Sequence, residues 1–307
     1  MLFEARKIVK RYAEHTALNE VSISVPKQSI FGLLGPNGAG KTSLIRIINQ
    51  ITAPDSGELI FNGRKLQAED VHRIGYLPEE RGLYKKMKVG DQALYLARLK
   101  GLETSFAKKE LLKWFKKFQI DSWWNKKVED LSKGMAQKIQ FIVTIIHQPE
   151  LLIFDEPFSG FDPINVNLLK KEILNLRDQG TTIIFSTHNM ASVEEVCDHI
   201  ALINQAETIL EGKVHEIKEQ FKEHIFEMVL EGDHQSLETD LNSHFSLLES
   251  KEVEQGQLLR VKMDANFSPN DVLNMSMKHG QLHYFKELLP SMNDIFIKMV
   301  ESQTKHI

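Results

Sequence analysis

The chain has 307 residues, of which 42% are hydrophobic and 26% charged, and its formal net charge is −4. This length and balance predict a globular protein with one large and one small domain, and they exclude a disordered chain or one that coats nucleic acid. The single cysteine, Cys197, excludes an intramolecular disulfide. We therefore expect the core alone to hold the fold, and the reducing cytoplasm to be the compartment.

The sequence shows neither a typical secretion signal nor an apolar segment long enough to cross a membrane. Charged side chains interrupt residues 1–15, so this segment is not typical of a secretion signal. The most apolar windows, residues 141–146 and 151–154, are far shorter than the ~20 residues that span a bilayer. If the protein acts at a membrane, we expect another chain to do the spanning.

Short apolar runs alternate with amphipathic segments over residues 1–222, a pattern typical of a mostly parallel sheet with helices packed on it. Strands are predicted at residues 29–35, 73–78, 151–157 and 181–188, and helices at residues 41–51 and 165–180. The predicted fold class of this large domain is therefore α/β.

Two regions differ from that alternation. Residues 89–135 are predicted to form a helical insert, whose many lysines we interpret as an ordinary solvated face, with Trp123 and Trp124 as packing residues. Residues 223–307 are predicted to form a small α/β domain with three strands and two helices. That domain has no phosphate-binding, metal-binding or nucleophile pattern, so a structural, dimerising or regulatory role is favoured.

The stretch GPNGAGKT matches a phosphate-binding loop and lies between a predicted apolar strand and an amphipathic helix. Glycines let successive backbone N–H groups point at phosphate oxygens, near the positive end of the helix. Lys41 adds a charge for the β- and γ-phosphates, and Thr42 offers a hydroxyl to Mg²⁺. The candidate ATP-binding residues here are Gly35, Pro36, Asn37, Gly38, Ala39, Gly40, Lys41, Thr42 and Ser43.

The stretch LLIFDEP supplies a second part of the candidate site. It ends a buried strand in Asp155 and Glu156, at the carboxyl edge where ligands bind in such sheets. We expect Asp155 to hold Mg²⁺ through water, and Glu156 to orient or deprotonate the water that attacks the γ-phosphate.

With these motifs in place, residues 2–220 resemble the ATP-binding subunit of ABC transporters. The specific element is LSKGMAQKIQ, residues 131–140, which resembles that family's signature motif. The resemblance implies that two chains pair head to tail around two ATP molecules, with Ser132 and Gly134 facing the partner's nucleotide. Lys133 and Met135 depart from the commonest form, in which glycine and glutamine stand there, but Ser132 and Gly134 are kept, so we expect the motif to function.

Three further positions are assigned by the same resemblance. Tyr12 is similar to the aromatic residue that stacks on adenine, although His15 and Phe31 also offer nearby rings. Asp162 in SGFD resembles the loop that crosses the dimer interface. His188 in FSTHN resembles the switch histidine that contacts the γ-phosphate and supports Glu156, so Glu156, His188 and Lys41 are the candidate catalytic residues.

The stretch YLPEERG, residues 76–82, lies where the family keeps a glutamine that reaches Mg²⁺ and the attacking water. The best register puts Glu79 in that place, so the candidate metal ligands are Thr42, Glu79 and Asp155. Whether Glu79 or Glu80 faces the metal stays open, and so does the alternative that both face solvent.

The resemblance implies ATP and Mg²⁺ as cofactors, membrane-spanning permease subunits as partners, and a place on the cytoplasmic face of the cell membrane. The tail is similar to that of sodium-efflux and drug-resistance exporters, so export is predicted. One rival is a non-transport ABC-type ATPase acting on ribosomes or DNA. The other, a P-loop kinase or GTPase, leaves residues 131–140, SGFD and His188 unexplained.

Overall fold

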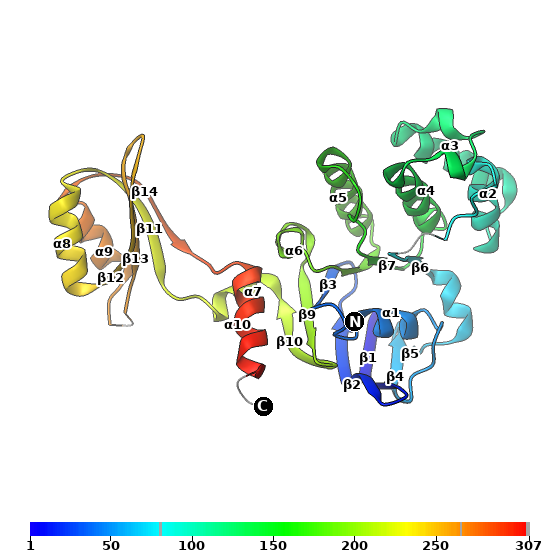
Figure 1. Ribbon diagram of the computed structural model, residues 1–307, viewed down its shortest axis with the longest axis horizontal. Helices are drawn as coiled ribbons and strands as arrows, with labels where there is room; N and C mark the ends of the chain where they lie inside the picture. Colours follow the sequence, from blue (N-terminus) through cyan, green and yellow to red (C-terminus); the bar gives the residue numbers. More distant parts are fainter. Residues whose placement is uncertain (80–81, 265, 305–307) are drawn as a thin grey trace. The chain divides into compact units, whose positions relative to one another are not determined.

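The computed structural model describes residues 1–79, 82–264 and 266–304, and it divides the chain into two compact units, Met1–Val214 and His215–Ile307 (Figure 1). Each unit contains its own hydrophobic core. A separate core is what allows a unit to be considered a domain.

A six-stranded sheet in the order β10-β9-β3-β8-β7-β6 is the centre of the first unit. Its strands are β3 (Ile30–Leu34), β6 (Ile74–Leu77), β7 (Leu151–Asp155), β8 (Thr182–Ser186), β9 (His199–Asn204) and β10 (Glu207–Lys213). All pair in parallel except β10, which is antiparallel to β9. Every residue of β3, β7 and β8 is buried, because continuous apolar runs suit strands covered on both faces. The predicted α/β class is confirmed.

A second, antiparallel sheet in the order β2-β1-β4-β5 completes the base of this unit. Its strands are β1 (Phe3–Tyr12), β2 (His15–Val25), β4 (Ser56–Phe61) and β5 (Arg64–Lys65). Helix α1 (Lys41–Ile48) shares one hydrophobic core with both sheets, through side chains such as Leu44, Ile8 and Ile153. The loop that precedes α1 is therefore anchored on a rigid layer.

The remaining helices of the first unit are α2 (Val89–Leu99), α3 (Thr104–Lys117), α4 (Lys133–Ile145), α5 (Pro163–Asp178) and α6 (Met190–Val196), and its 3₁₀ turns are η1 (Ala68–Arg73), η2 (Asp121–Trp123) and η3 (Val128–Asp130). In the view of Figure 1, α2, α3, α4 and α5 lie above strands β6 and β7, whereas α1 lies below them. The predicted packing role of Trp124 is confirmed, since its ring lies 5.3 Å from that of Phe115 and directly against Gly90. In the described part of the chain, no helix is both long and apolar enough to cross a bilayer.

The second unit has a four-stranded antiparallel sheet in the order β12-β13-β11-β14. Its elements are α7 (Val214–Gln220), β11 (Ile225–Gly232), α8 (His234–His244), β12 (Ser246–Val253), β13 (Gly256–Lys262), α9 (Pro269–Ser276), β14 (Gly280–Leu288) and α10 (Met292–Thr304). Leu237 of α8 and Val272 of α9 pack with Met228 and Leu259 on one face of this sheet. Strand β12 and helix α8 were not among the predicted elements.

Candidate active site

The loop between β3 and α1 has a backbone that only glycine can follow at its two ends. Gly35 has φ 147° and Gly40 has φ 111°. A β-carbon on Gly35 would lie 2.1 Å from the carbonyl oxygen of Ile203, and one on Gly40 would lie 2.3 Å from that of Ala17. Because the obstacles are backbone atoms, a side chain at either place would force the loop to move.

The side chain of Lys41 is folded back into this loop. Its Nζ donates hydrogen bonds to the carbonyl oxygens of Gly35 (2.7 Å) and Pro36 (3.0 Å), and the residue is 9% exposed. Burial lowers the pKa of Lys41, while the negative charges of Glu156, Asp155 and Glu79 oppose that change. The three carboxylates predicted from two separate motifs are thus close enough to act on the predicted phosphate-binding lysine.

Asp155 ends β7 and is 5% exposed. Burial raises its pKa, the charges of Glu79 and Glu156 act in the same direction, and Lys41 opposes them. Such a concentration of negative charge around one buried carboxylate is favourable only when a cation offsets part of it. The chemistry of the site therefore fits a divalent cation beside the ammonium of Lys41.

Glu156 is held by donors from the loop after the neighbouring strand, β8. His188 Nδ1 lies 2.6 Å and the His188 backbone nitrogen 2.9 Å from Glu156 Oε1, and Thr187 Oγ1 donates to Oε2 at 3.1 Å. The backbone of Glu156 has φ 48°, a sparsely populated conformation for a residue other than glycine. The predicted pairing of Glu156 with His188 is present, and Thr187 is an additional partner that the motifs did not identify.

Glu79 is exposed and follows the end of β6. Its charge acts on Lys41 and Asp155, and it helps burial and Asp155 to raise the pKa of Tyr76 to about 12. Glu80, the alternative to Glu79 in this motif, lies outside the described residues, as does Arg81. The geometry therefore puts Glu79 among the site's charges.

The expected metal ligands would leave part of the coordination of Mg²⁺ to water and to the phosphates of the nucleotide. Within residues 1–79, 82–264 and 266–304, no group of three or more His, Cys, Asp or Glu side chains could hold a metal ion. Thr42, in the first turn of α1, is exposed, and Asp155 is buried. Mg²⁺ commonly keeps several waters and takes one or two protein ligands plus substrate phosphates, so this donor set fits it.

Ser132 and Asp162 each begin a helix. Ser132 Oγ accepts a hydrogen bond from the Met135 nitrogen (3.3 Å) at the start of α4, the usual arrangement of a helix N-cap. Asp162 accepts one from the Asn165 nitrogen (3.0 Å) at the start of α5, and this hydrogen bond lowers its pKa.

The loops that carry these two caps lie against each other. The Lys133 side chain packs on Gly160, which has φ 84°, and Gln137 Nε2 donates to the Ser159 carbonyl oxygen. The methylenes of Lys133 therefore fill space beside Gly160 that a side chain there would need. Gly134 is 3.8 Å from the nearest atoms of this loop, measured from where its β-carbon would stand.

Tyr12 closes the hairpin of β1 and β2, opposite His15. The side chain is 43% exposed, and Lys10 Nζ lies 5.5 Å from the centre of its ring. One face of an exposed ring held by a cation remains able to stack on a planar base.

Comparison with known proteins agrees with these features. The family model of ABC transporters matches residues 18–159, and the model described as "ATP-binding protein DrrA1-3-like, C-terminal domain" matches residues 212–300. An uncharacterised ABC transporter ATP-binding protein of Bacillus subtilis, YhaQ, is 42% identical over 293 residues, which is 95% of this chain and 96% of the relative. The lantibiotic transport ATP-binding protein SrtF of Streptococcus pyogenes is 32% identical over 68% of this chain and 90% of its own length.

Solved structures of ATP-binding subunits of ABC transporters are also similar to this chain. The ATP-binding subunit of an ABC transporter aligns with a TM-score of 0.67 at 28% identity, over 72% of this chain and 93% of that one. A nucleotide-free ATP-binding cassette aligns with a TM-score of 0.63 at 23% identity, over 71% and 94%, and supports the fold. The chain thus belongs to the ATP-binding subunits of ABC transporters, which bind and hydrolyse ATP and act with membrane-spanning permease subunits.

Proposed function

We propose that this chain is the ATP-hydrolysing subunit of an exporter and lies peripherally on the cytoplasmic face of the cell membrane. Export is supported by the relatives, which include lantibiotic transport, linearmycin resistance and Nod factor export ATP-binding proteins. The second unit matches the C-terminal domain of DrrA1-3-like ATP-binding proteins. Cargo is then recognised by the membrane-spanning subunits.

The observation that carries the proposed chemistry is the arrangement around Glu156. This carboxylate stands beside buried Asp155, acts electrostatically on Lys41 and accepts hydrogen bonds from Thr187 and from His188. In our proposal Glu156 orients or deprotonates the attacking water, and His188 keeps it in place and contacts the γ-phosphate.

The nucleotide would be held by Gly35 through Ser43, with Tyr12 against the adenine. Lys41 would exchange its two carbonyl partners for β- and γ-phosphate oxygens, which are stronger acceptors because they are charged. Mg²⁺ would be held by Thr42, Asp155 and Glu79, and when bound it would neutralise charge that develops on the phosphate.

Two copies would close head to tail over two ATP molecules, with Ser132, Gly134 and Asp162 at the partner's nucleotide. The caps at Ser132 and Asp162 support this, because each residue stands at the start of a helix, and a helix N-terminus is a favourable place for an anion such as a phosphate. The contact between their two loops means that a closing motion would move them together.

Mixing two inactive variants tests this pairing. Lys41→Ala removes the phosphate-binding lysine, and Ser132→Ala removes the hydroxyl that faces the other chain's nucleotide. In a mixed dimer one site receives an intact lysine from one chain and an intact serine from the other. ATP hydrolysis by the mixture should exceed the sum of the two variants alone, and a mixture no more active than that sum would refute the proposal.

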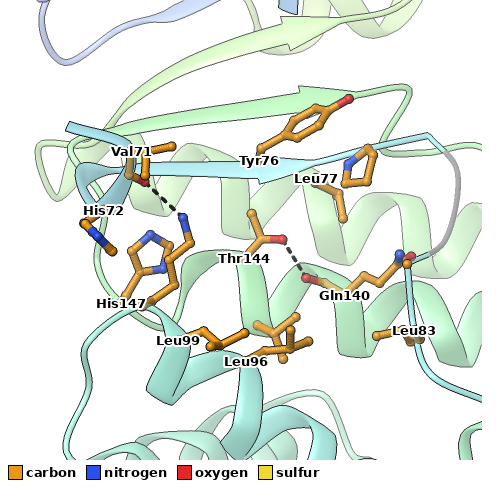
Figure 2. A pocket seen from close by; sticks show the side chains of 14 residues that line it. Val71, His72, Tyr76, Leu77, Leu83, Leu96, Leu99, Gln140, Thr144 and His147 are labelled. Atoms are coloured by element: carbon orange, nitrogen blue, oxygen red, sulfur yellow. Dashed lines mark hydrogen bonds between the residues drawn. The ribbon is translucent and has the colours of Figure 1, made fainter. Parts of the chain in front are cut away.

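The permease contact is proposed at a pocket of about 360 Å³ in the first unit. Figure 2 shows Tyr76 and Leu77 of β6, Leu96 and Leu99 of α2, and Gln140, Thr144 and His147 around it. The pocket thus touches the strand that leads to Glu79 and the helix that begins after Ser132. A permease segment bound there would contact both the strand before Glu79, at this chain's own nucleotide, and the helix after Ser132, which faces the partner's nucleotide.

Copurification tests this contact. The Leu99 side chain is 57% exposed at the pocket, and that of Leu112 on α3 is 44% exposed away from it. Leu99→Glu should reduce the amount of membrane protein that copurifies while ATP binding persists, and Leu112→Glu should not. Equal recovery of the membrane protein with both variants would remove the pocket from the proposal.

A further inference from the structure

The sheet of the second unit has one face that its helices do not use. Helices α8 and α9 pack on the face that carries Met228 and Leu259 (Figure 1). The opposite face, which we call the open face, is partly exposed and has three complete rows of paired residues across all four strands. In the order β14, β11, β13, β12, the first row is Lys286, Glu227, Arg260 and Glu249, the second is Tyr284, Val229, Leu258 and Lys251, and the third, which holds a single charge, is Leu288, Ile225, Lys262 and Ser246.

The first row alternates in charge from one edge of the sheet to the other. Arg260 bonds both of its neighbours, through Nε to Glu227 (2.7 Å) and through a terminal nitrogen to Glu249 (2.6 Å). The side chains of Arg260 and Glu249 still keep 42% and 40% exposure. Arg260 and Glu249 can therefore meet a further surface without first leaving a buried position, whereas the Glu227 side chain is 15% exposed.

The second row is apolar at its centre. Val229 and Leu258 are half-buried, and Tyr284 is 40% exposed at one edge with Lys251 exposed at the other. The apolar pair therefore lies on the two central strands, with the aromatic ring on the outer strand β14 and the ammonium on the outer strand β12.

We propose that the open face binds the open face of a second copy of this chain, related by a twofold axis that runs along the strands between β11 and β13. Rotation about that axis reverses the strand order, so β14 covers β12 and β11 covers β13. Lys286 then faces Glu249, and Glu227 faces Arg260, which places every charge of the row opposite its complement.

The same rotation also matches the second row. Val229 faces Leu258, and the Tyr284 ring faces the Lys251 ammonium, a favourable cation–π pair. A twofold axis across the strands would instead put Glu227 over Glu227, so the charges select one geometry. Two sheets stacked in this way have nearly aligned strands and lie about 10 Å apart, as in sandwich folds.

A second copy fits better than a partner of one charge. An acidic or basic surface would meet like charges at half of the positions in the first row, and like charges brought together cost free energy. A self-complementary patch is what a twofold interface requires. This association needs no nucleotide, so it is separate from the ATP-dependent pairing proposed above and can fail or succeed without it.

Sedimentation velocity of the full, nucleotide-free chain tests the proposal. The wild type should form dimers, and Arg260→Glu should raise the dissociation constant roughly tenfold or more. Adding Glu227→Arg to that variant again places opposite charges at positions 227 and 260 of the two facing copies, and should restore association. Val229→Glu should also weaken it. Lys278→Glu and Met277→Glu, at exposed positions just after α9, are matched controls and should have no effect.

Cross-linking separates the second copy from other occupants. A mixture of Val229→Cys and Leu258→Cys chains, treated with a bismaleimide of about 10 Å, should join more chains than either variant alone. Thermal unfolding of each variant reports whether its fold is intact. A chain that stays monomeric at every concentration tested, a double variant no better than Arg260→Glu, or a mixture of the two cysteine variants that cross-links no more chains than either variant alone would each overturn the proposal.

Discussion

Glu156 Oε1 lies 2.6 Å from Nδ1 and 2.9 Å from the backbone nitrogen of His188, so one residue holds the carboxylate with both its ring and its main chain. The two residues follow β7 and β8, which are neighbours in the central sheet. Parallel pairing places the carboxyl ends of these strands at the same edge, and the contact results from the topology itself.

Replacing this carboxylate tests its proposed role. Glu156→Gln keeps the shape and removes the charge that accepts a proton, so ATP binding should persist while hydrolysis falls about 10²- to 10⁴-fold. Nucleotide binding and phosphate release, measured on the same preparation, check both parts. Hydrolysis at the wild-type rate would show that Glu156 is not the base.

The hydroxyl of Thr187 is predicted to position Glu156. It donates to Glu156 Oε2 at 3.1 Å, accepts from the Asn189 nitrogen at 3.1 Å, and the residue is 2% exposed. Hydrogen bonds to charged groups contribute about 1.5–3 kcal/mol. Thr187→Val should therefore lower kcat about tenfold or more with KM for ATP unchanged, and Thr187→Ser should stay near the wild type. A rise in KM with kcat unchanged would indicate a binding role instead.

The sequence predicted most strands of the central sheet, because fully buried strands are continuous apolar runs bounded by glycine and proline. It did not predict the antiparallel sheet of β1, β2, β4 and β5, whose half-buried strands mix charged and apolar side chains. Strand β12 was missed for the same reason, since SLLESKEV is largely polar.

Residues of the candidate site could be predicted where a sequence motif sets their spacing. They were harder to predict where a side chain is held by a hydrogen bond from a neighbouring strand. Lys41 and Asp155 are 114 positions apart in the numbering, yet the motifs place Lys41 in the loop and helix after one strand and Asp155 at the end of another. Thr187 was inside a quoted motif, beside His188, but its role depends on the direction of one hydroxyl. No spacing in a sequence specifies that direction.

Gly35 and Gly38 offer a matched pair of substitutions in the phosphate-binding loop. A β-carbon on Gly35 would lie 2.1 Å from the Ile203 carbonyl oxygen, whereas one on Gly38, with φ 81°, would meet no atom within 4 Å. Gly35→Ala should abolish ATP binding and lower Tm. Gly38→Ala should cost only the left-handed conformation, about 1–2 kcal/mol. If both variants bound ATP equally well, the backbone contact at Ile203 would not constrain the loop.

Glu79 is predicted to act on the metal. Its charge reaches Asp155 and Lys41, and a carboxylate oxygen is a good ligand for Mg²⁺. Glu79→Gln should shift the Mg²⁺ concentration that half-activates hydrolysis, whereas Glu69→Gln, at an exposed position of η1, should not. A titration of ATPase activity with Mg²⁺, carried out on both variants, measures this shift. Unchanged rate and metal dependence for Glu79→Gln would leave Glu79 as a solvated loop residue.

His147 is predicted to make the fold sensitive to acid. Both of its ring nitrogens are buried, without a hydrogen-bond partner among the described residues, in the wall of the pocket that Figure 2 shows. Burial lowers its pKa from 6.5 to about 4, and the charges of Lys100 and His72 act in the same direction.

The sign of the effect follows from which state binds the proton. Between pH 6.5 and about 4, the unfolded chain protonates His147 while the folded chain keeps it neutral, so stability is complete above that window and is lost as the pH falls through it. The loss at pH 5 relative to pH 7 should be about 1–2 kcal/mol. Urea unfolding at both pH values should show this loss for the wild type and for His15→Gln, at an exposed position, but a smaller one for His147→Gln. An equal loss in all three proteins would mean that other groups titrate instead.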